Sequence, residues 1–252
     1  MLDNVNLAEL TSPDIKTALE SGYETVVFAI GSNEQHGPCL PVFTDVLIGD
    51  ELALSVAYKL GKALKGPTVN LGCSEHHMKF PGTISMRRET LQSVIVDYVD
   101  CLARHGFKRV VIIPSHGGNF GPLAEISDDL KRSHPEVNIV AYTDLQRFVE
   151  ILQTTSAKLG VTPEESGAHA GESEVSMVMR IRGDLVKEER IPEATGYVGA
   201  FTEKEADKIF EGGIDVLSPI GVIGDPANAR KEHGKRYIED LAYALVEYIS
   251  TQ

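Results

Sequence analysis

The chain carries the run Thr25-Val-Val-Phe-Ala-Ile30 directly before the polar loop Gly31-Ser-Asn-Glu-Gln-His-Gly-Pro-Cys-Leu-Pro-Val-Phe-Thr-Asp45. A short apolar run rich in β-branched residues is typical of a strand buried on both faces of a parallel sheet. Open α/β sheets bind their ligands outside the carboxyl ends of such strands. The stretch therefore predicts an α/β fold with a functional loop after its first strand.

The loop contains three candidate metal ligands, Glu34, His36 and Asp45. One imidazole and two carboxylates suit a hard or borderline divalent metal. Side chains repeat every two residues along an extended backbone, so Glu34 and His36 share a face if the loop stays extended. Two prolines and a glycine stiffen the return to Asp45.

Strand and helix patterns alternate along the chain. The expected strands are 25–30, 67–71, 109–113 and 137–142; the expected helices are 11–21, about 45–64, 88–105, 121–133, 145–159 and 227–250. Such alternation implies βαβ units, with right-handed crossovers and helices on both faces of a mostly parallel sheet. The length suits one domain spanning 1–252. Residues 182–219 lack clear periodicity and are interpreted as a lid, an oligomer contact or an ordinary surface excursion.

The composition excludes several classes of protein. Hydrophobic residues make up 42% and charged residues 24%, as in ordinary soluble proteins. A formal net charge of −13 argues against binding to nucleic acid or to an anionic membrane. Three cysteines without C-x-x-C spacing indicate neither a disulfide framework nor a structural zinc site. We recognise no signal peptide and no membrane-spanning run, so the cytoplasm is the expected location.

A second polar cluster, Ser115-His-Gly-Gly-Asn-Phe120, follows a predicted strand. Gly117 and Gly118 would let the backbone approach a ligand closely or take a positive φ, with N–H groups facing an anion. The alternative is an ordinary glycine-rich turn in which His116 only caps a neighbouring group.

A third cluster, Gly167-Ala-His-Ala-Gly-Glu-Ser-Glu174, lies where a helix is expected to begin. The helix macrodipole accounts for Glu172 and Glu174 without any catalytic purpose. It does not account for His169.

A fourth cluster, Cys73-Ser-Glu-His-His-Met-Lys-Phe-Pro-Gly-Thr83, follows the second expected strand. Adjacent residues cannot easily face one site, so we expect His76 to contact substrate and His77 to be structural. Ser74 is a further candidate for substrate binding. The remaining histidines, at 105, 134 and 233, are interpreted as solvated surface residues.

The four clusters gain meaning together. Loops that follow parallel strands gather at the carboxyl edge of the sheet, so these polar residues should meet there. A metal site is the simplest physical account of that convergence.

The motifs resemble those of the creatininase family of metal-dependent amidohydrolases. The matching elements are Glu34-Gln-His-Gly-Pro…Leu-Pro…Thr-Asp45, Glu75-His-His…Phe-Pro-Gly-Thr83, His116-Gly-Gly-Asn119, His169-Ala-Gly-Glu-Ser-Glu174 and Gly221-Val-Ile-Gly-Asp-Pro-Ala-Asn-Ala229. These five motifs follow the family's order and span roughly residues 7–250.

The resemblance implies an α/β/α sandwich, one or two divalent metal ions and a homo-oligomer, a hexamer as in relatives. Zinc is favoured, and manganese or iron also suits the ligand set. By position, the ligands would be Glu34, His36, Asp45 and His116, with Asp45 able to bridge two ions.

The fifth ligand must come from elsewhere. Creatininase has a carboxylate where this chain has Gly118, and we expect Glu172 to replace it. Glu174 matches a family glutamate that could instead ligate the metal or orient another group, and His169 matches the family histidine near the substrate. Cys39 stands where many relatives have histidine, Pro114-Ser115 replace the common Asn-Gly, and the chain has no tryptophan to contact creatinine.

The resulting hypothesis is hydrolysis of a non-peptide C–N bond, in a cyclic amide or a formamide, by a metal-activated water. His169 would protonate the departing nitrogen, helped by Glu172 or Glu174. The substrate would be a small-molecule amide in contact with Ser74, His76, Gly117 and Gly118.

Two alternatives stay open. One is a deformylase of a nucleotide-like pyrimidine, with Lys79, Arg87 and Arg88 as candidates for a phosphate pocket. The other is a metal-binding maturation or partner protein without turnover of its own.

Overall fold

Four parallel strands form the centre of the protein. The computed structural model describes residues 2–252, apart from the side chain of Glu203. The strands are β1 (Thr25–Ile30), β2 (Ala63–Lys65), β3 (Arg109–Pro114) and β4 (Asn138–Ala141), in the order β2-β1-β3-β4. In β1 and β3 every residue after the first is buried, as expected for strands covered on both faces.

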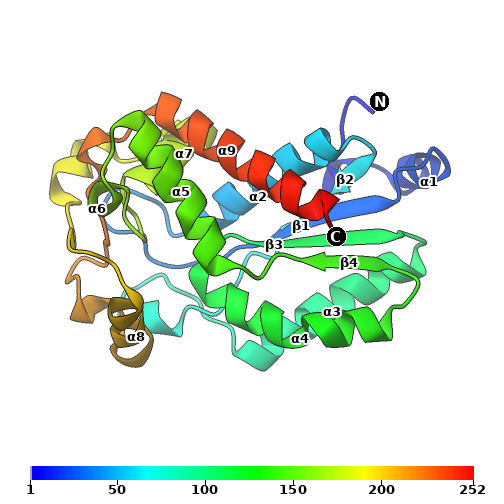
Figure 1. The fold of residues 1–252 in the computed structure, drawn as a ribbon, viewed down its shortest axis with the longest axis horizontal. Helices are drawn as coiled ribbons and strands as arrows, with labels where there is room; N and C mark the ends of the chain where they lie inside the picture. Colours follow the sequence, from blue (N-terminus) through cyan, green and yellow to red (C-terminus); the bar gives the residue numbers. More distant parts are fainter. Residues whose placement is uncertain (1) are drawn as a thin grey trace.

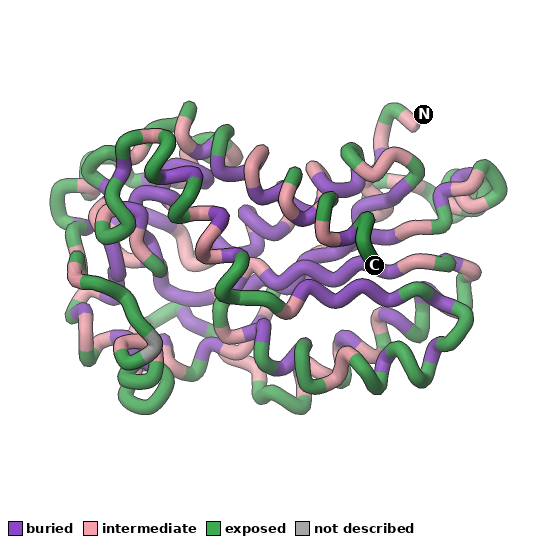
Figure 2. The backbone as a smooth tube through the Cα atoms, viewed as in Figure 1, coloured by how far each residue is buried: buried purple, intermediate pink, exposed green. Residues whose placement is uncertain are grey.

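Helices cover both faces of the sheet (Figure 1). Above it in that view lie α2 (Thr44–Leu60), α5 (Leu145–Leu159), α7 (Glu172–Arg182) and α9 (Lys231–Ser250); below it lie α3 (Arg88–Arg104) and α4 (Phe120–Ser133). The three-layer α/β/α sandwich predicted from the sequence is therefore confirmed. Figure 2 shows the buried sheet between helices that are exposed on their outer sides.

Shorter elements complete the chain. The remaining α-helices are α1 (Ser12–Glu20), α6 (Pro163–Ser166) and α8 (Glu203–Gly212). The 3-10 helices are Leu7–Glu9, Glu75–His77, Gly117–Asn119, Gly183–Leu185, Glu188–Glu193, Ile214–Val216 and Pro226–Asn228. Within residues 2–252, no helix combines the length and the apolar character needed to cross a membrane.

The prediction of a second strand at 67–71 is wrong. The strand is 63–65 and overlaps the end of the helix expected at about 45–64, because α2 stops at Leu60 and Gly61 takes φ +93°. Residues 67–71 contribute only an isolated bridge between Val69 and Ile30. A three-residue strand is too short to show a periodic pattern. The longer apolar run at 67–71 was therefore predicted to be the second strand.

Two further expectations are corrected. The closing helix begins at Lys231, because residues 226–228 form a separate 3-10 turn. Residues 182–219 contain the amphipathic helix α8, which the sequence analysis did not predict.

The topology creates the position of the site. β1 and β3 are adjacent and in register from Thr25 opposite Arg109 to Ile30 opposite Pro114. After β1 the chain enters α2 on one face, and after β3 it enters α4 on the other (Figure 1). Such a switch point separates the two loops and leaves a crevice between them, where α/β proteins bind ligands.

Candidate metal centre

Polar side chains from three of the predicted clusters converge at the switch point. Three overlapping sets have ligand atoms within 4.8 Å of one another: Glu34, His36 and His169; Glu34, Asp45 and His116; and His36, Asp45 and Glu174. We call these six residues the ligand cluster. The loop after β1 supplies Glu34 and His36, and the first turn of α2 supplies Asp45.

The carboxylate of Asp45 lies between two imidazoles. His36 Nε2 is 3.4 Å from Asp45 Oδ1 and 3.7 Å from Glu174 Oε2. His116 Nδ1 is 3.5 Å from Asp45 Oδ2 and 3.2 Å from Glu34 Oε1. Ligands bound tetrahedrally at about 2.0–2.2 Å from zinc lie roughly 3.3–3.6 Å apart. The spacing is therefore that of ligands arranged around ions, with Asp45 shared by two sets.

Each histidine of the ligand cluster is oriented by a backbone carbonyl. His36 Nδ1 donates to Glu34 O at 3.1 Å, His116 Nε2 to Cys73 O at 3.0 Å, and His169 Nε2 to Gln35 O at 2.8 Å. A carbonyl oxygen can only accept, so each of these nitrogens carries the hydrogen. The other ring nitrogen then points to the carboxylates and can bind a metal when it carries no proton; proteins orient metal-binding histidines in this way.

Three atoms of the ligand cluster are buried without a hydrogen-bond partner: Glu34 Oε1, His36 Nε2 and Asp45 Oδ2. Buried polar atoms nearly always have a hydrogen-bond partner, because burial removes their hydration and costs free energy unless another interaction replaces it. Cations held by the three overlapping sets would give each of these atoms a partner. The donor set and its unpaired atoms therefore fit a divalent metal.

Opposite charges shift the pKa values in the cluster. Burial opposes ionisation of Glu34, but the charges of His116 and His77 hold its pKa well below the ordinary range. Burial works against protonation of His36 and His116, yet Asp45 and Glu34 raise their pKa values to about 10 and about 9. Burial also raises the pKa of Glu174, to about 7. The buried carboxylates therefore attract positive charge into the cluster, which protons on the imidazoles or a bound cation can supply.

Glu172 does not join the cluster, which contradicts the expectation that it is the fifth ligand. Its buried carboxylate accepts hydrogen bonds from Ser176 Oγ at 2.7 Å, His233 Nδ1 at 2.8 Å and Tyr237 Oη at 2.7 Å. Residues two apart on a helix point about 200° from each other, so only one of these glutamates can face the site. Glu174 is that residue.

Two histidines expected at the surface are instead paired. His233 is the Glu172 partner just described, with a side chain 16% exposed. His134 is buried, with Nε2 2.6 Å from Asp100 Oδ1. His105, at the end of α3, is exposed as expected.

A cavity of about 140 Å³ opens beside the ligand cluster. Its polar end is lined by Glu34, His76, His77, His116, Gly117, Gly118 and His169. Three of the four predicted substrate contacts, His76, Gly117 and Gly118, thus lie at the cavity.

Ser74 does not line the cavity. It is fully buried, and its hydroxyl donates to Glu34 Oε2 and lies beside Ser32 Oγ. Its expected contact with substrate is therefore replaced by support of a candidate ligand.

Gly117 and Gly118 differ in how closely other atoms surround them. Neither takes a positive φ, contrary to one expectation. A Cβ on Gly118 would lie 2.2 Å from Cys73 O and 2.5 Å from His116 Nε2, whereas a Cβ on Gly117 would meet no atom within 4 Å. Gly118 is required by the position of the His116 ring.

The role of Gln35 was not predicted from the sequence, and His77 was predicted to be only structural. Gly37 N–H donates to Gln35 Oε1 at 2.9 Å, which fixes the amide orientation. Gln35 Nε2 then donates to Gly221 O at 2.9 Å and to His77 Nδ1 at 3.0 Å. His77 Nε2 therefore carries hydrogen, and it lies 3.5 Å from Glu34 Oε1. Gln35 belongs to the first motif and Gly221 to the last, but nothing in the spacing of these motifs shows that the two residues are in contact.

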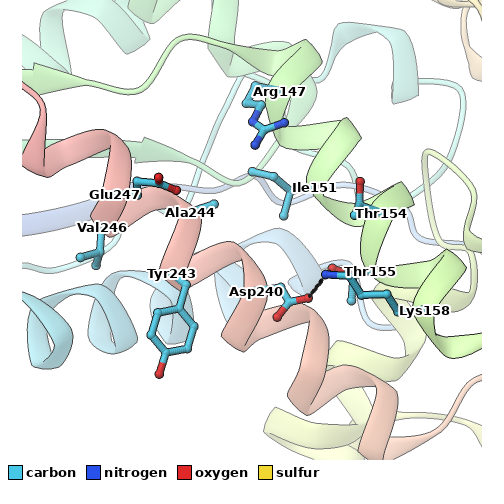
Figure 3. Close-up of a pocket in the computed structure, with 10 residues that line it drawn as sticks. All are labelled: Arg147, Ile151, Thr154, Thr155, Lys158, Asp240, Tyr243, Ala244, Val246 and Glu247. Carbon is cyan, nitrogen blue, oxygen red and sulfur yellow. Dashed lines mark hydrogen bonds and ion pairs between the residues drawn. The ribbon is translucent and has the colours of Figure 1, made fainter.

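A larger hollow of about 510 Å³ lies between α5 and α9 (Figure 3). Its walls carry charged residues such as Lys158 and Asp240, which form an ion pair at 3.5 Å. None of its described lining residues is histidine or cysteine. It is not a candidate metal site.

Comparisons with known proteins identify relatives of this chain. The family model "Creatininase: Creatinine amidohydrolase" matches residues 8–249. A mycofactocin precursor peptide peptidase of Mycolicibacterium smegmatis is 28% identical, over 92% of this chain and 86% of that protein. A creatinine amidohydrolase of Pseudomonas putida is 28% identical, over 76% and 77% of the two chains. A 2-amino-5-formylamino-6-ribosylaminopyrimidin-4(3H)-one 5'-monophosphate deformylase of Methanothermobacter thermautotrophicus is 29% identical, over 87% and 86%.

Solved structures show the same fold. A crystal structure of creatinine amidohydrolase (creatininase) superposes with a TM-score of 0.82 at 23% identity, over 99% of this chain and 98% of that one. Related structures are described as a mutant creatininase of Zn-Zn type and as creatininase Mn.

Proposed function

This chain belongs to the creatininase family, and from that premise we propose that it is a metal-dependent hydrolase of a C–N bond in a small amide. Glu34, His36, Asp45, His116 and Glu174 would hold one or two divalent ions, with zinc favoured. Zinc and manganese in the related creatininase structures support this choice.

One observation carries the proposal. Glu34 Oε1, His36 Nε2 and Asp45 Oδ2 are buried, lack hydrogen-bond partners and belong to interlocking sets of ligand atoms. An apolar or fully hydrogen-bonded core would leave none of them unpaired. One or two cations bound by these sets would give each of the three atoms a partner.

A bound divalent metal supplies polarisation of the amide carbonyl and a nucleophilic water at neutral pH. His169 is placed to move the proton. Its Nε2–H is committed to Gln35 O, and its Nδ1 lone pair lies 3.6 Å from Glu34 Oε1. Burial and the charges of His36 and His77 hold the His169 pKa well below its usual range, so the ring is neutral. It can accept a proton at Nδ1 from the attacking water and return it to the departing nitrogen.

The expected reaction remains hydrolysis of a cyclic amide or a formamide. A nucleotide substrate is disfavoured, because none of the described residues lining the cavity is lysine or arginine. Two of the candidates for a phosphate pocket are also engaged elsewhere. Lys79 pairs with Asp215 at 2.9 Å, and Arg88 pairs with Glu125.

A peptide bond is the second candidate substrate. The relative from Mycolicibacterium smegmatis is named as a peptidase and aligns over nearly the whole chain. Small peptides therefore belong in the same substrate panel as lactams, imides and formamides.

The test begins with the metal content of the anaerobically purified protein, followed by activity on that panel. His36→Ala should lose bound metal and turnover while its circular dichroism spectrum stays unchanged. His105→Ala, a change at an exposed histidine, is the matched control and should keep both. Full metal stoichiometry in His36→Ala would contradict the assignment of His36 as a metal ligand. Tight metal binding without hydrolysis of any class would favour a binding protein.

A further inference from the structure

We propose that the site selects an uncharged amide with an apolar group, about the size of a phenyl ring, next to the scissile bond. This inference rests on the proposed function, because it takes the ligand cluster as the reaction centre. The group would lie between the first turns of α5 and helix α8.

The lining of the cavity beside the ligand cluster has a polar part and an apolar part. Next to the polar residues named above, which form the polar end, the cavity is lined by an apolar wall made of Leu145, Val149, Ala168, Phe201, Ala206, Ile209, Phe210, Ile214 and Ile223. An amide held at the polar end must extend the rest of the molecule along this wall. Burying apolar surface there is worth about 25 cal/mol for each Å² removed from water.

A row of rings connects the wall with the ligand cluster. His76 stacks on His116 with ring centroids 5.6 Å apart, and Phe210 lies 4.8 Å from His76. Phe210 is 56% exposed and Phe201 is 40% exposed. Large apolar side chains left open beside a reaction centre mark a surface that a ligand covers.

The wall is held in place by a small core of its own. Ile209, Ile214 and Ile223 pack together with Phe80, Tyr197 and Leu217. Ile223 also exchanges backbone hydrogen bonds with His169, at 2.8 and 3.2 Å. The apolar wall is therefore tied directly to the residue proposed to move the proton, and it exists before substrate binds.

Charge and size narrow the substrate further. None of the described residues lining the cavity is lysine or arginine, so a carboxylate held against the apolar wall would lose its hydration without gaining a counter-charge. The cavity of about 140 Å³ is close to the roughly 150 Å³ engineered cavity that binds benzene in another protein. One ring or one branched aliphatic group fits.

Hydroxamates test this inference without knowledge of the natural substrate. Their head group binds metals, so the variable group reports on the wall alone. We would titrate zinc-loaded protein calorimetrically with acetohydroxamate, benzohydroxamate, butyrohydroxamate and succinic monohydroxamate. Benzohydroxamate should bind about tenfold tighter than acetohydroxamate, and the succinic compound should bind about tenfold weaker than butyrohydroxamate.

Two variants locate the selectivity. Phe210→Ala should remove most of the advantage of benzohydroxamate while acetohydroxamate binding changes little. Leu145→Arg places a cation at the wall and should strengthen binding of the succinic compound. Tyr243→Ala removes an aromatic side chain that is 63% exposed on α9, outside this cavity, and should leave all four affinities unchanged.

The outcomes separate the two proposals. Equal binding of acetohydroxamate and benzohydroxamate, or tighter binding of the anion by the unmodified protein, overturns the inference and leaves the metal centre standing. Failure of every hydroxamate to bind the zinc-loaded protein overturns this inference, whereas failure of the protein to take up zinc overturns the metal centre and this inference with it.

Discussion

Glu172 and Glu174 lie in the same turn of α7 and serve different parts of the molecule. Glu172 accepts hydrogen bonds from Tyr237 and His233 of α9, whereas Glu174 accepts one from Ala170 N–H at 2.5 Å and faces His36. One glutamate therefore joins two helices, and the other completes the ligand cluster.

This difference predicts opposite effects of matched substitutions. Glu172→Gln replaces a carboxylate that accepts three hydrogen bonds, and the free energy of unfolding should fall by about 1–3 kcal/mol. Its metal content should stay full. Glu174→Gln should lose metal affinity and activity while stability of the metal-free protein is kept. Urea unfolding and metal analysis of both variants check the pair, and a metal-free Glu172→Gln protein would contradict the assignment.

The sequence predicted which loops lie close together, but it did not predict the orientation of individual side chains. Glu34, His36, Asp45 and His116 follow two predicted strands of a parallel sheet, so their convergence at its carboxyl edge could be predicted. Choosing between Glu172 and Glu174 required the rotation of α7 about its axis. Ser74 and Gln35 act through contacts with residues at least 40 positions away, such as Glu34 for Ser74 and Gly221 for Gln35. No local pattern records such contacts.

Metal binding should depend on pH in a defined direction. In the metal-free protein the pKa values of His36 and His116 are raised to about 10 and about 9, so both carry protons at pH 7. A metal must displace those protons, and its affinity should rise as the pH is raised from 6 to 8, by about tenfold per unit for each proton released. Calorimetry in two buffers with different ionisation enthalpies measures the release. An affinity independent of pH would show that these nitrogens are not the ligands.

The same pKa values bear on stability. A histidine whose folded pKa is raised contributes stability that is fully present below its unfolded pKa of about 6.5 and is lost as the pH rises through the folded value. The metal-free protein should therefore lose stability between pH 7 and pH 10. The zinc-loaded protein should lose less, because the metal replaces the protons. The difference in melting temperature between the two forms should widen over that range, and a constant or shrinking difference would count against this linkage.

The two adjacent glycines of the His116 motif offer a matched pair. Gly118→Ala would push a methyl group against Cys73 O and the His116 ring, so His116 must move and metal should be lost. Gly117→Ala meets no atom within 4 Å, so its metal content should stay full. Metal analysis of the two purified proteins distinguishes them. Equal metal content would mean that His116 tolerates displacement or is not a ligand.

Gln35 tests whether hydrogen bonds behind the site position the histidines for catalysis. Gln35→Met keeps the length of the side chain but leaves Gly221 O and Gly37 N–H without their partner, which should cost about 2 kcal/mol or more of the free energy of unfolding. The candidate ligands are untouched, so metal should be retained. His77 loses the donor that fixes its hydrogen on Nε2, and kcat should fall about tenfold on the best substrate of the panel, with a smaller change in KM. A loss of stability with kcat unchanged would make Gln35 a purely structural residue, because a positioning role must appear in the rate.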